Sequence, residues 1–478
     1  MRSTNPNSQR GVAIRSQFAP WLLALIAACS TLSQAAALGA TGSASASSPG
    51  EKDTGGASGT QPTRPPTRLP PLVAQFTLEP LPQPSDPPSS SSLTLDELEQ
   101  MALANNPTLS AALANVRAAR GRQIQSGLPP NPKIGYFGMD IGEDDTAGQH
   151  GGFVSQEFVT GGKLRLNRAV GGREVEMQES LLEAQRRRIV NDVQLRFYDS
   201  LVAQRRVELT EEIASVSGQL AETSQTLLEA LQVSRSDLLQ AEIEAQETEI
   251  FAANARNQRA EAWRRLAAAI GVPDLAMTQL AGNLNDALGE YGWEATYARL
   301  MSQSPELSAA EARVQRARLA ILRARRENVP NVEVMASASH MTQNGDDVAG
   351  VQVGIPLPIC NRNQGNILAA EAELVAAQNN SRRLELQLQE RLAAAYRRYA
   401  DARQQVERYQ QEILPRAQEA LELVGRGYRE GQVDFISLLT TQRTYIRSNL
   451  AYIEALAELR QATTLIDGMV LSDSLQAE

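Results

Sequence analysis

A helical repeat of apolar positions dominates the chain. No proline stands between Gly162 and Pro273, and residues 209–227 place apolar side chains at alternating steps of four and three. The same spacing returns in residues 395–413, and residues 438–459 carry a large apolar side chain at every seventh position. This spacing is typical of coiled-coil seams. A helix over residues 163–232 would extend about 105 Å, so the pattern predicts long packed helices, which taken alone would suit a structural spacer.

Both long helices are interrupted at matching places. The first interruption covers residues 233–237, and the second covers residues 425–428 and 431–434. Glycine and Ser or Asp caps are the residues that end one helix and begin the next. We therefore expect each long helix to turn back as a hairpin whose tip lies far from the strands.

Four short segments alternate apolar and polar residues: 133–141, 153–159, 332–339 and 349–357. Polar loops over residues 143–152 and 343–347 join them in pairs. Segments of about 9–11 residues cross a bilayer when tilted. A half-buried soluble hairpin shows the same alternation, and the strand pattern alone favours that interpretation. Four strands do not close a channel by themselves, whereas three copies of the chain would supply twelve.

The chain reads as two tandem repeats. Pro107 and Pro305 are separated by 305 − 107 = 198 residues, and Tyr198 and Tyr396 keep the same offset. We expect a first repeat over residues 93–285, a second over residues 286–471 and a tail over residues 472–478. In each repeat the predicted order is helix, strand pair, very long helix, break and helix, which gives a mostly α fold with a small β part.

Composition agrees with long helices and excludes several classes of function. Aromatic residues make up 4% of the chain, which is low for a globular core of 478 residues. The net charge of −9 is spread over interspersed acidic and basic residues, so we expect no nucleic-acid partner. Cys360 stands alone outside the leader, so no internal disulfide is expected. His150 and His340 stand alone in sequence, so no metal site or cofactor is predicted.

The N-terminus has the layout of an export signal. Three arginines precede an apolar stretch over residues 18–28, which is too short to span a bilayer. The signal peptide is assigned to residues 1–37, with two alternatives for its end: a lipobox that would place a lipid on Cys29, or cleavage at the A-x-A site of residues 35–37. Residues 38–92 are rich in Gly, Ser and Pro and are interpreted as a disordered linker. No other run of 18 apolar residues exists, so no transmembrane helix is expected.

The order of short motifs resembles the TolC family of outer-membrane efflux proteins over residues 93–471. The matching pieces are LTLDEL at residues 93–98 followed by Asn106 and Pro107, VSQEF at residues 154–158, GGK at residues 161–163, GYREG at residues 427–431, and Leu438 with Leu439.

This resemblance implies a homotrimer with a long periplasmic α-barrel of coiled-coil helices. Each subunit would give four strands to a twelve-stranded outer-membrane β-barrel in contact with outer-membrane lipid. The hairpin tips would form the gate and dock a periplasmic adaptor (membrane fusion protein), which bridges to an inner-membrane pump of the RND type. The tip residues implied are Ser234, Ser236, Asp237, Gly427, Tyr428, Gly431, Asp434, Ser437 and Thr440. Asp434 and Asp237 are open to two interpretations, a ring of charge in the trimer or a helix cap, and for Asp434 the cap is favoured.

Within the family, residues 355–365 (IPLPICNRNQG) resemble the CzcC-like, cobalt–zinc–cadmium resistance branch, although an aromatic residue is common there at the position of Cys360. The resemblance therefore implies passive efflux of small solutes, with divalent metal cations as the expected cargo. The alternatives are a duct for drugs or secreted proteins, and a periplasmic coiled-coil adaptor. No nucleophile elbow, P-loop or Gly-rich dinucleotide turn is present, so no enzymatic activity is expected.

Overall fold

The structure is a computed structural model that describes residues 92–142, 147–231, 233–285, 289–430 and 432–475. All of them belong to one compact unit, Gln75–Glu478. The predicted signal peptide with Cys29, the predicted linker up to residue 91, and Gly431 lie outside the described residues.

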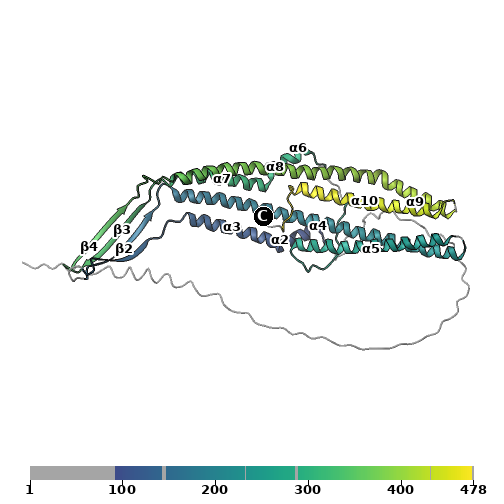
Figure 1. Cartoon of the computed structure of the whole chain (residues 1–478), viewed down its shortest axis with the longest axis horizontal. Helices are drawn as coiled ribbons and strands as arrows, with labels where there is room; N and C mark the ends of the chain where they lie inside the picture. The colour runs from purple at the N-terminus through teal and green to yellow at the C-terminus, as the bar shows by residue number, and fades with distance from the viewer. Residues whose placement is uncertain (1–91, 143–146, 232, 286–288, 431, 476–478) are drawn as a thin grey trace, which may run out of the picture. The chain divides into compact units, whose positions relative to one another are not determined.

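The elements follow the predicted order in both halves (Figure 1). The first half contains α2 (Leu95–Asn105), α3 (Pro107–Ser126), β1 (Lys133–Met139), β2 (Gln149–Phe158), α4 (Lys163–Glu229) and α5 (Arg235–Ile270). The second half contains α6 (Trp293–Gln303), α7 (Pro305–Arg326), β3 (Val332–Met341), β4 (Asp346–Gly354), α8 (Gln364–Arg408), the π-helical turn η2 (Tyr409–Ile413), α9 (Leu414–Arg429) and α10 (Phe435–Asp467). The prediction of a mostly helical fold with a small sheet is confirmed.

The repeat is visible in how the helices begin. Asn106 caps α3 and Ser304 caps α7, and each cap is followed by a proline at the first helical position. Proline suits this position because its missing N–H has no partner inside the helix. α2 and α6 are each 11 residues long and start 293 − 95 = 198 residues apart.

The two halves also build two equivalent cores. Phe197 and Ile189 of α4 pack with Leu98 of α2 in one cluster, whereas Leu392 of α8 packs with Leu300 of α6 in the other. Tyr452 of α10 reaches the first cluster and Leu459 reaches the second. α10 therefore joins the two halves.

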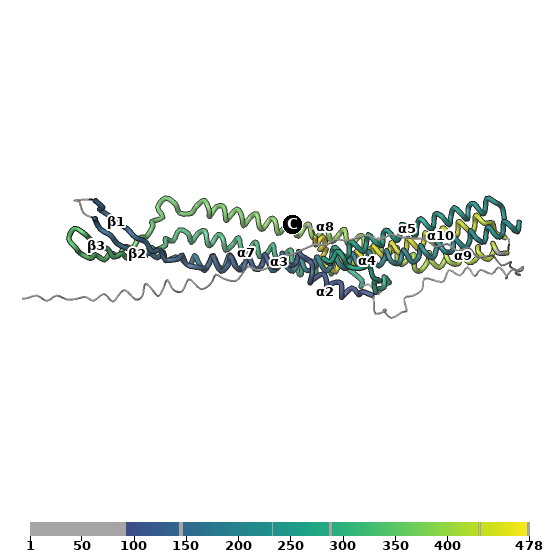
Figure 2. Tube along the Cα trace, turned by 90° about the horizontal axis from the view of Figure 1, so that it is seen from below, coloured from purple at the N-terminus to yellow at the C-terminus, as the bar shows by residue number. Residues whose placement is uncertain are grey.

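The strands form one antiparallel sheet in the order β1-β2-β3-β4, so β1 and β4 are its edges. The two repeats meet at the β2–β3 pair, where Val154 lies opposite Ala336. One face of the sheet exposes apolar side chains, including Ile134, Val351 and Val353. The strands lie at the opposite end of the helices from the α4–α5 and α9–α10 connections (Figures 1 and 2).

Two strand boundaries differ from the prediction. β4 ends at Gly354, not at Leu357, because Pro356 and Pro358 have no N–H to continue a ladder. β2 begins at Gln149, inside the predicted polar loop, because its glycines pair with β3 through their backbone. In the described part of the chain, no helix is both long and apolar enough to cross a membrane.

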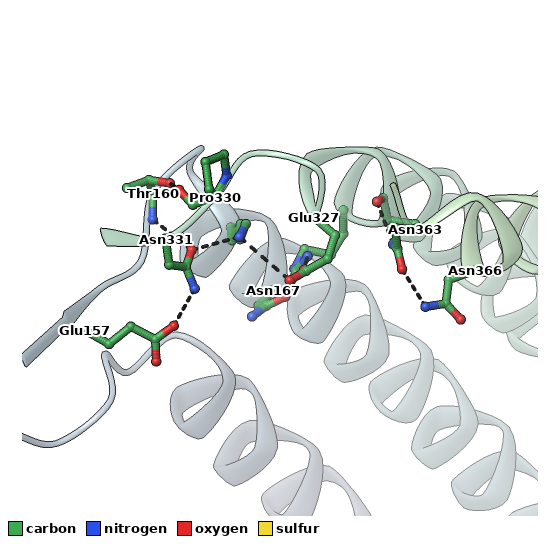
Figure 3. Close-up of polar contacts among 11 residues, drawn as sticks. Glu157, Thr160, Asn167, Glu327, Pro330, Asn331, Asn363 and Asn366 are labelled. Atoms are coloured by element: carbon green, nitrogen blue, oxygen red, sulfur yellow. Dashed lines mark hydrogen bonds and ion pairs between the residues drawn. The ribbon is translucent and has the colours of Figure 1, made fainter. Parts of the chain in front are cut away.

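A polar cluster joins the sheet to the helices (Figure 3). Lys163, the first residue of α4, is buried, and its ammonium group donates to Asn331 Oδ1 at 2.7 Å. Asn331 lies just before β3 and donates in turn to Glu157 Oε1 of β2 at 2.6 Å. Glu327 lies 3.7 Å from the same ammonium group. The cluster thus holds the β2–α4 corner against the α7–β3 corner.

Candidate functional site

The candidate site is the pair of hairpin tips, where α4 turns into α5 and α9 turns into α10. Figure 2 shows α5, α9 and α10 gathered at the same end of the bundle. At the first tip α4 ends at Glu229, and Leu231 adopts a left-handed backbone (φ 59) with its side chain 91% exposed. A leucine so exposed in a strained turn lies at the extreme end of the hairpin.

Ser234, Ser236 and Asp237 build the start of α5. The Ser234 hydroxyl accepts from the Asp237 backbone N–H, and the Asp237 carboxylate accepts from the Ser234 N–H at 3.0 Å, which is a capping box. The hydroxyl oxygens of Ser234 and Ser236 lie 2.6 Å apart. Asp237 is therefore committed to its own helix, and no neighbouring residue is needed to explain its charge.

The second tip differs from the prediction in one respect. Gly425, Gly427 and Tyr428 lie inside α9, which runs to Arg429, and the turn itself begins only at Glu430. A glycine is tolerated within a helix, and here the Gly427 carbonyl accepts from the Gln432 N–H at 2.8 Å, which closes the turn. A side chain at Gly427 would meet Val433 Cγ2 at 2.6 Å, so the close turn requires glycine.

Asp434 is the N-cap of α10, and its carboxylate accepts from the Ser437 N–H at 3.3 Å. This is the cap interpretation. Ser437 and Thr440 follow on the exposed side of α10, and the Thr440 hydroxyl donates to the Ile436 carbonyl. The exposed face of this first turn is consequently hydroxylated and uncharged beyond Asp434.

An apolar cluster joins the two tips. Phe435 and Leu439 of α10 pack with Leu220 of α4 and Ala241 of α5, and Tyr428 packs against this group. The Tyr428 and Phe435 rings lie 6.1 Å apart. Burial raises the pKa of the Tyr428 hydroxyl, and the nearby negative charge of Asp237 raises it further. The tips are thus one packed unit rather than two independent hairpins.

One ion pair across the tips was missed by sequence reasoning. Arg443 of α10 donates through Nε to the Glu244 carboxylate of α5 at 2.8 Å, and Glu247 lies 3.4 Å from the same guanidinium group. The Glu244 side chain is only 5% exposed, whereas that of Arg443 is 49% exposed. The hydrogen bond to Glu244 raises the pKa of Arg443. The only available signal was the repeat, since the two residues are 443 − 244 = 199 positions apart.

No metal centre adjoins these tips. Among the residues that the structure describes, no group of three or more His, Cys, Asp or Glu side chains is placed to hold a metal ion. His150 and His340, which stand alone in sequence, lie opposite each other on β2 and β3, and His340 Nδ1 is 2.9 Å from Asp347 Oδ1.

Solved structures with this architecture are outer-membrane channels. The channel CusC matches with a TM-score of 0.68 at 18% identity, covering 78% of this chain and 91% of CusC. The open state of the Neisseria gonorrhoeae MtrE outer membrane channel matches with a TM-score of 0.65 at 19% identity, covering 80% of this chain and 91% of MtrE. The fold is therefore that of an outer-membrane channel subunit.

The chain belongs to the outer membrane efflux protein family, which it matches over residues 98–272 and 296–468. The two matched segments begin 296 − 98 = 198 residues apart, the offset seen in the sequence. A curated relative, the cobalt-zinc-cadmium resistance protein CzcC of Cupriavidus metallidurans, is 26% identical over 375 residues, 78% of this chain and 89% of the relative. The protein is thus an outer-membrane efflux protein.

Proposed function

We propose that three copies of this chain form a passive duct that carries divalent metal cations from a periplasmic adaptor and an RND-type inner-membrane pump to the cell exterior. The observation that carries this proposal is the opposition of two ends in one molecule. A four-stranded sheet with two free edges and one exposed apolar face lies at one end, and a packed pair of helical tips lies at the other.

The sheet explains the need for more than one copy. Backbone groups on the free edges of β1 and β4 must be paired inside a bilayer, because the hydrocarbon offers no hydrogen-bond partners. Three copies would pair every edge in a ring of twelve strands. The tips would then converge around one axis, where a change in the Arg443–Glu244 contact can open or close the duct.

The cargo is inferred from the relatives. The name of CzcC refers to resistance to cobalt, zinc and cadmium, and the segment IPLPICNRNQG has the features of the same branch. A duct needs no high-affinity site for its cargo, because the pump selects what enters. The chain is accordingly proposed to catalyse no reaction of its own. Family membership favours this function over the periplasmic adaptor alternative.

Deletion of the gene tests the cargo. We expect the deletion strain to accumulate Zn²⁺, Co²⁺ or Cd²⁺ and to lose tolerance to them, with recovery when the wild-type chain is supplied. A strain that accumulates drugs but not these cations would contradict the metal assignment and favour the drug-duct alternative. Unchanged tolerance to both cargo classes would contradict efflux.

A further inference from the structure

Two helices bound the protomer and leave complementary faces uncovered. α3 packs on α4, α4 on α7 and α7 on α8, so α3 and α8 end this row of helices. α8 exposes three large apolar side chains on its outer face, those of Leu368, Val375 and Leu386, at 69%, 56% and 56%. α3 exposes small side chains, those of Ala111, Ala114 and Ala118.

The contact between α4 and α7 inside the protomer provides a template for these faces. Met177 of α4 packs onto Ala309 and Ala312 of α7 in a buried cluster. Two ion pairs flank this contact. Glu174 pairs with Arg316 at 3.1 Å, and Arg188 pairs with Glu306.

The repeat offset transfers this template to the two free edges. Shifting by 198 residues takes Met177 to Val375 (177 + 198), Ala309 to Ala111 (309 − 198) and Ala312 to Ala114 (312 − 198). A large apolar side chain is thus again placed opposite two alanines. The difference is that the first set lies within one chain, whereas α8 and α3 have no contact within the protomer.

The flanking charges change together under the same shift. Glu174 and Arg316 become Ala372 and Ala118, since 174 + 198 = 372 and 316 − 198 = 118.

The second ion pair behaves in the same way. Arg188 and Glu306 become Leu386 and Thr108, since 188 + 198 = 386 and 306 − 198 = 108. Both members of each ion pair are therefore replaced by uncharged residues, and no lone charge is left on either edge. A single unmatched charge in a packed helix contact would cost free energy, so the joint replacement fits two faces that meet.

We propose that α8 of one copy docks on α3 of the next, with Val375 seated over Ala111 and Ala114 and with Ala372 and Leu386 facing Ala118 and Thr108. This docking rests on the proposed trimer and specifies its helical interface. Because the two faces differ, the contact is head-to-tail and closes into a ring when the rotation per copy permits it. The interface between copies is thus a second, uncharged version of the α4–α7 contact.

Cysteine cross-linking of the full-length chain in membranes tests the contact. In a Cys360→Ser background, the double variant Ala114→Cys with Val375→Cys should form disulfides between copies, giving linked dimers and trimers on non-reducing gels. Each single variant should give no such ladder. The matched control, Met177→Cys with Ala312→Cys, should form a disulfide within one chain and leave the mass unchanged.

Transfer of the internal ion pair gives a second test. Ala118→Arg or Ala372→Glu alone should lower the temperature at which the unboiled trimer dissociates, because each places one charge in an uncharged contact. The two substitutions together should recover stability by re-creating the Glu174–Arg316 pair between copies. Both positions are exposed in the protomer, so the far-UV circular dichroism of the single variants should match the wild type.

The outcomes separate this contact from the trimer itself. An unboiled trimer without Ala114–Val375 cross-links and without recovery in the charge pair would overturn the proposed contact and leave the duct intact. A wild-type chain that is monomeric in the membrane would overturn both.

Discussion

Charged side chains at the hairpin tips serve two distinct purposes. Asp237 and Asp434 accept backbone N–H groups at the starts of α5 and α10, so they stabilise the ends of single helices. Glu244 is buried and meets Arg443 of another hairpin, so it joins two helices that are distant in sequence. Control over the distance between the tips therefore rests on Glu244 and Arg443 rather than on the caps.

Arg443→Ala should weaken the packing of α5 against α10. Loss of one partner leaves a buried carboxylate unpaired, and because Arg443 is half exposed we expect a cost of about 1–2 kcal/mol, below that of a fully buried pair. Thermal unfolding measures the cost. In the assembled duct the same variant should raise the leak conductance in a planar bilayer.

Two further variants identify the cause. Arg447→Ala removes an exposed arginine one turn later on α10 and should change neither quantity. Glu244→Gln combined with Arg443→Ala removes the unpaired charge and should recover part of the lost stability. A leak of equal size in Arg447→Ala would contradict a specific role for the pair.

The residue scale also shows how far the sequence could be interpreted. The caps at Ser234 and Asp434 follow from short local patterns, and sequence analysis anticipated the cap role of Asp434. The Glu244–Arg443 pair and the His150–His340 pair join residues about 190–200 positions apart. Nothing in a local window marks such partners, because the contact depends on how two helices or two strands are placed.

At the scale of elements, the long helices were predictable and their ends were less so. α4 begins at Lys163, as predicted, and ends three residues before the predicted residue 232. The Gly425–Tyr428 segment was predicted as a break but lies within α9, because glycine lowers helix propensity without forbidding a helix. The true turn is fixed by the close approach of Gly427 to Val433.

A matched pair of substitutions tests that turn. Nothing lies within 4 Å of a side chain added at Gly425, so Gly425→Ala should stabilise α9 by about 0.5–1 kcal/mol. At Gly427 the same change meets Val433 and should offset or reverse this gain. Denaturant unfolding of the two variants measures the difference, and equal stabilisation by both would show that the second tip does not depend on a close turn.

The corner between sheet and helices is a second element-scale feature. Asn331→Ala should destabilise the protein by roughly 1–3 kcal/mol, because the buried Lys163 ammonium group loses its 2.7 Å acceptor. Thermal unfolding of the variant measures this loss. Arg165→Gln, two residues along α4 and exposed, serves as the control and should have little effect. An unchanged melting temperature for Asn331→Ala would contradict the role of the cluster in holding the corner.

At the scale of the whole molecule, the repeat explains most of the architecture. One plan, repeated with an offset of 198 residues, yields equivalent caps, equivalent cores and a sheet whose central pair joins the halves. Sequence analysis found this plan from proline and tyrosine positions alone. The exact strand ends and the edge helices could not be derived from it, because they depend on backbone pairing and on surfaces that one chain leaves uncovered.

The most direct test of the central claim is the mass of the unboiled protein extracted in detergent from the outer-membrane fraction. We expect a species of three copies that collapses to the monomer on boiling. A monomer recovered from the soluble periplasmic fraction would contradict the duct, and the long hairpins would then be those of a spacer or adaptor.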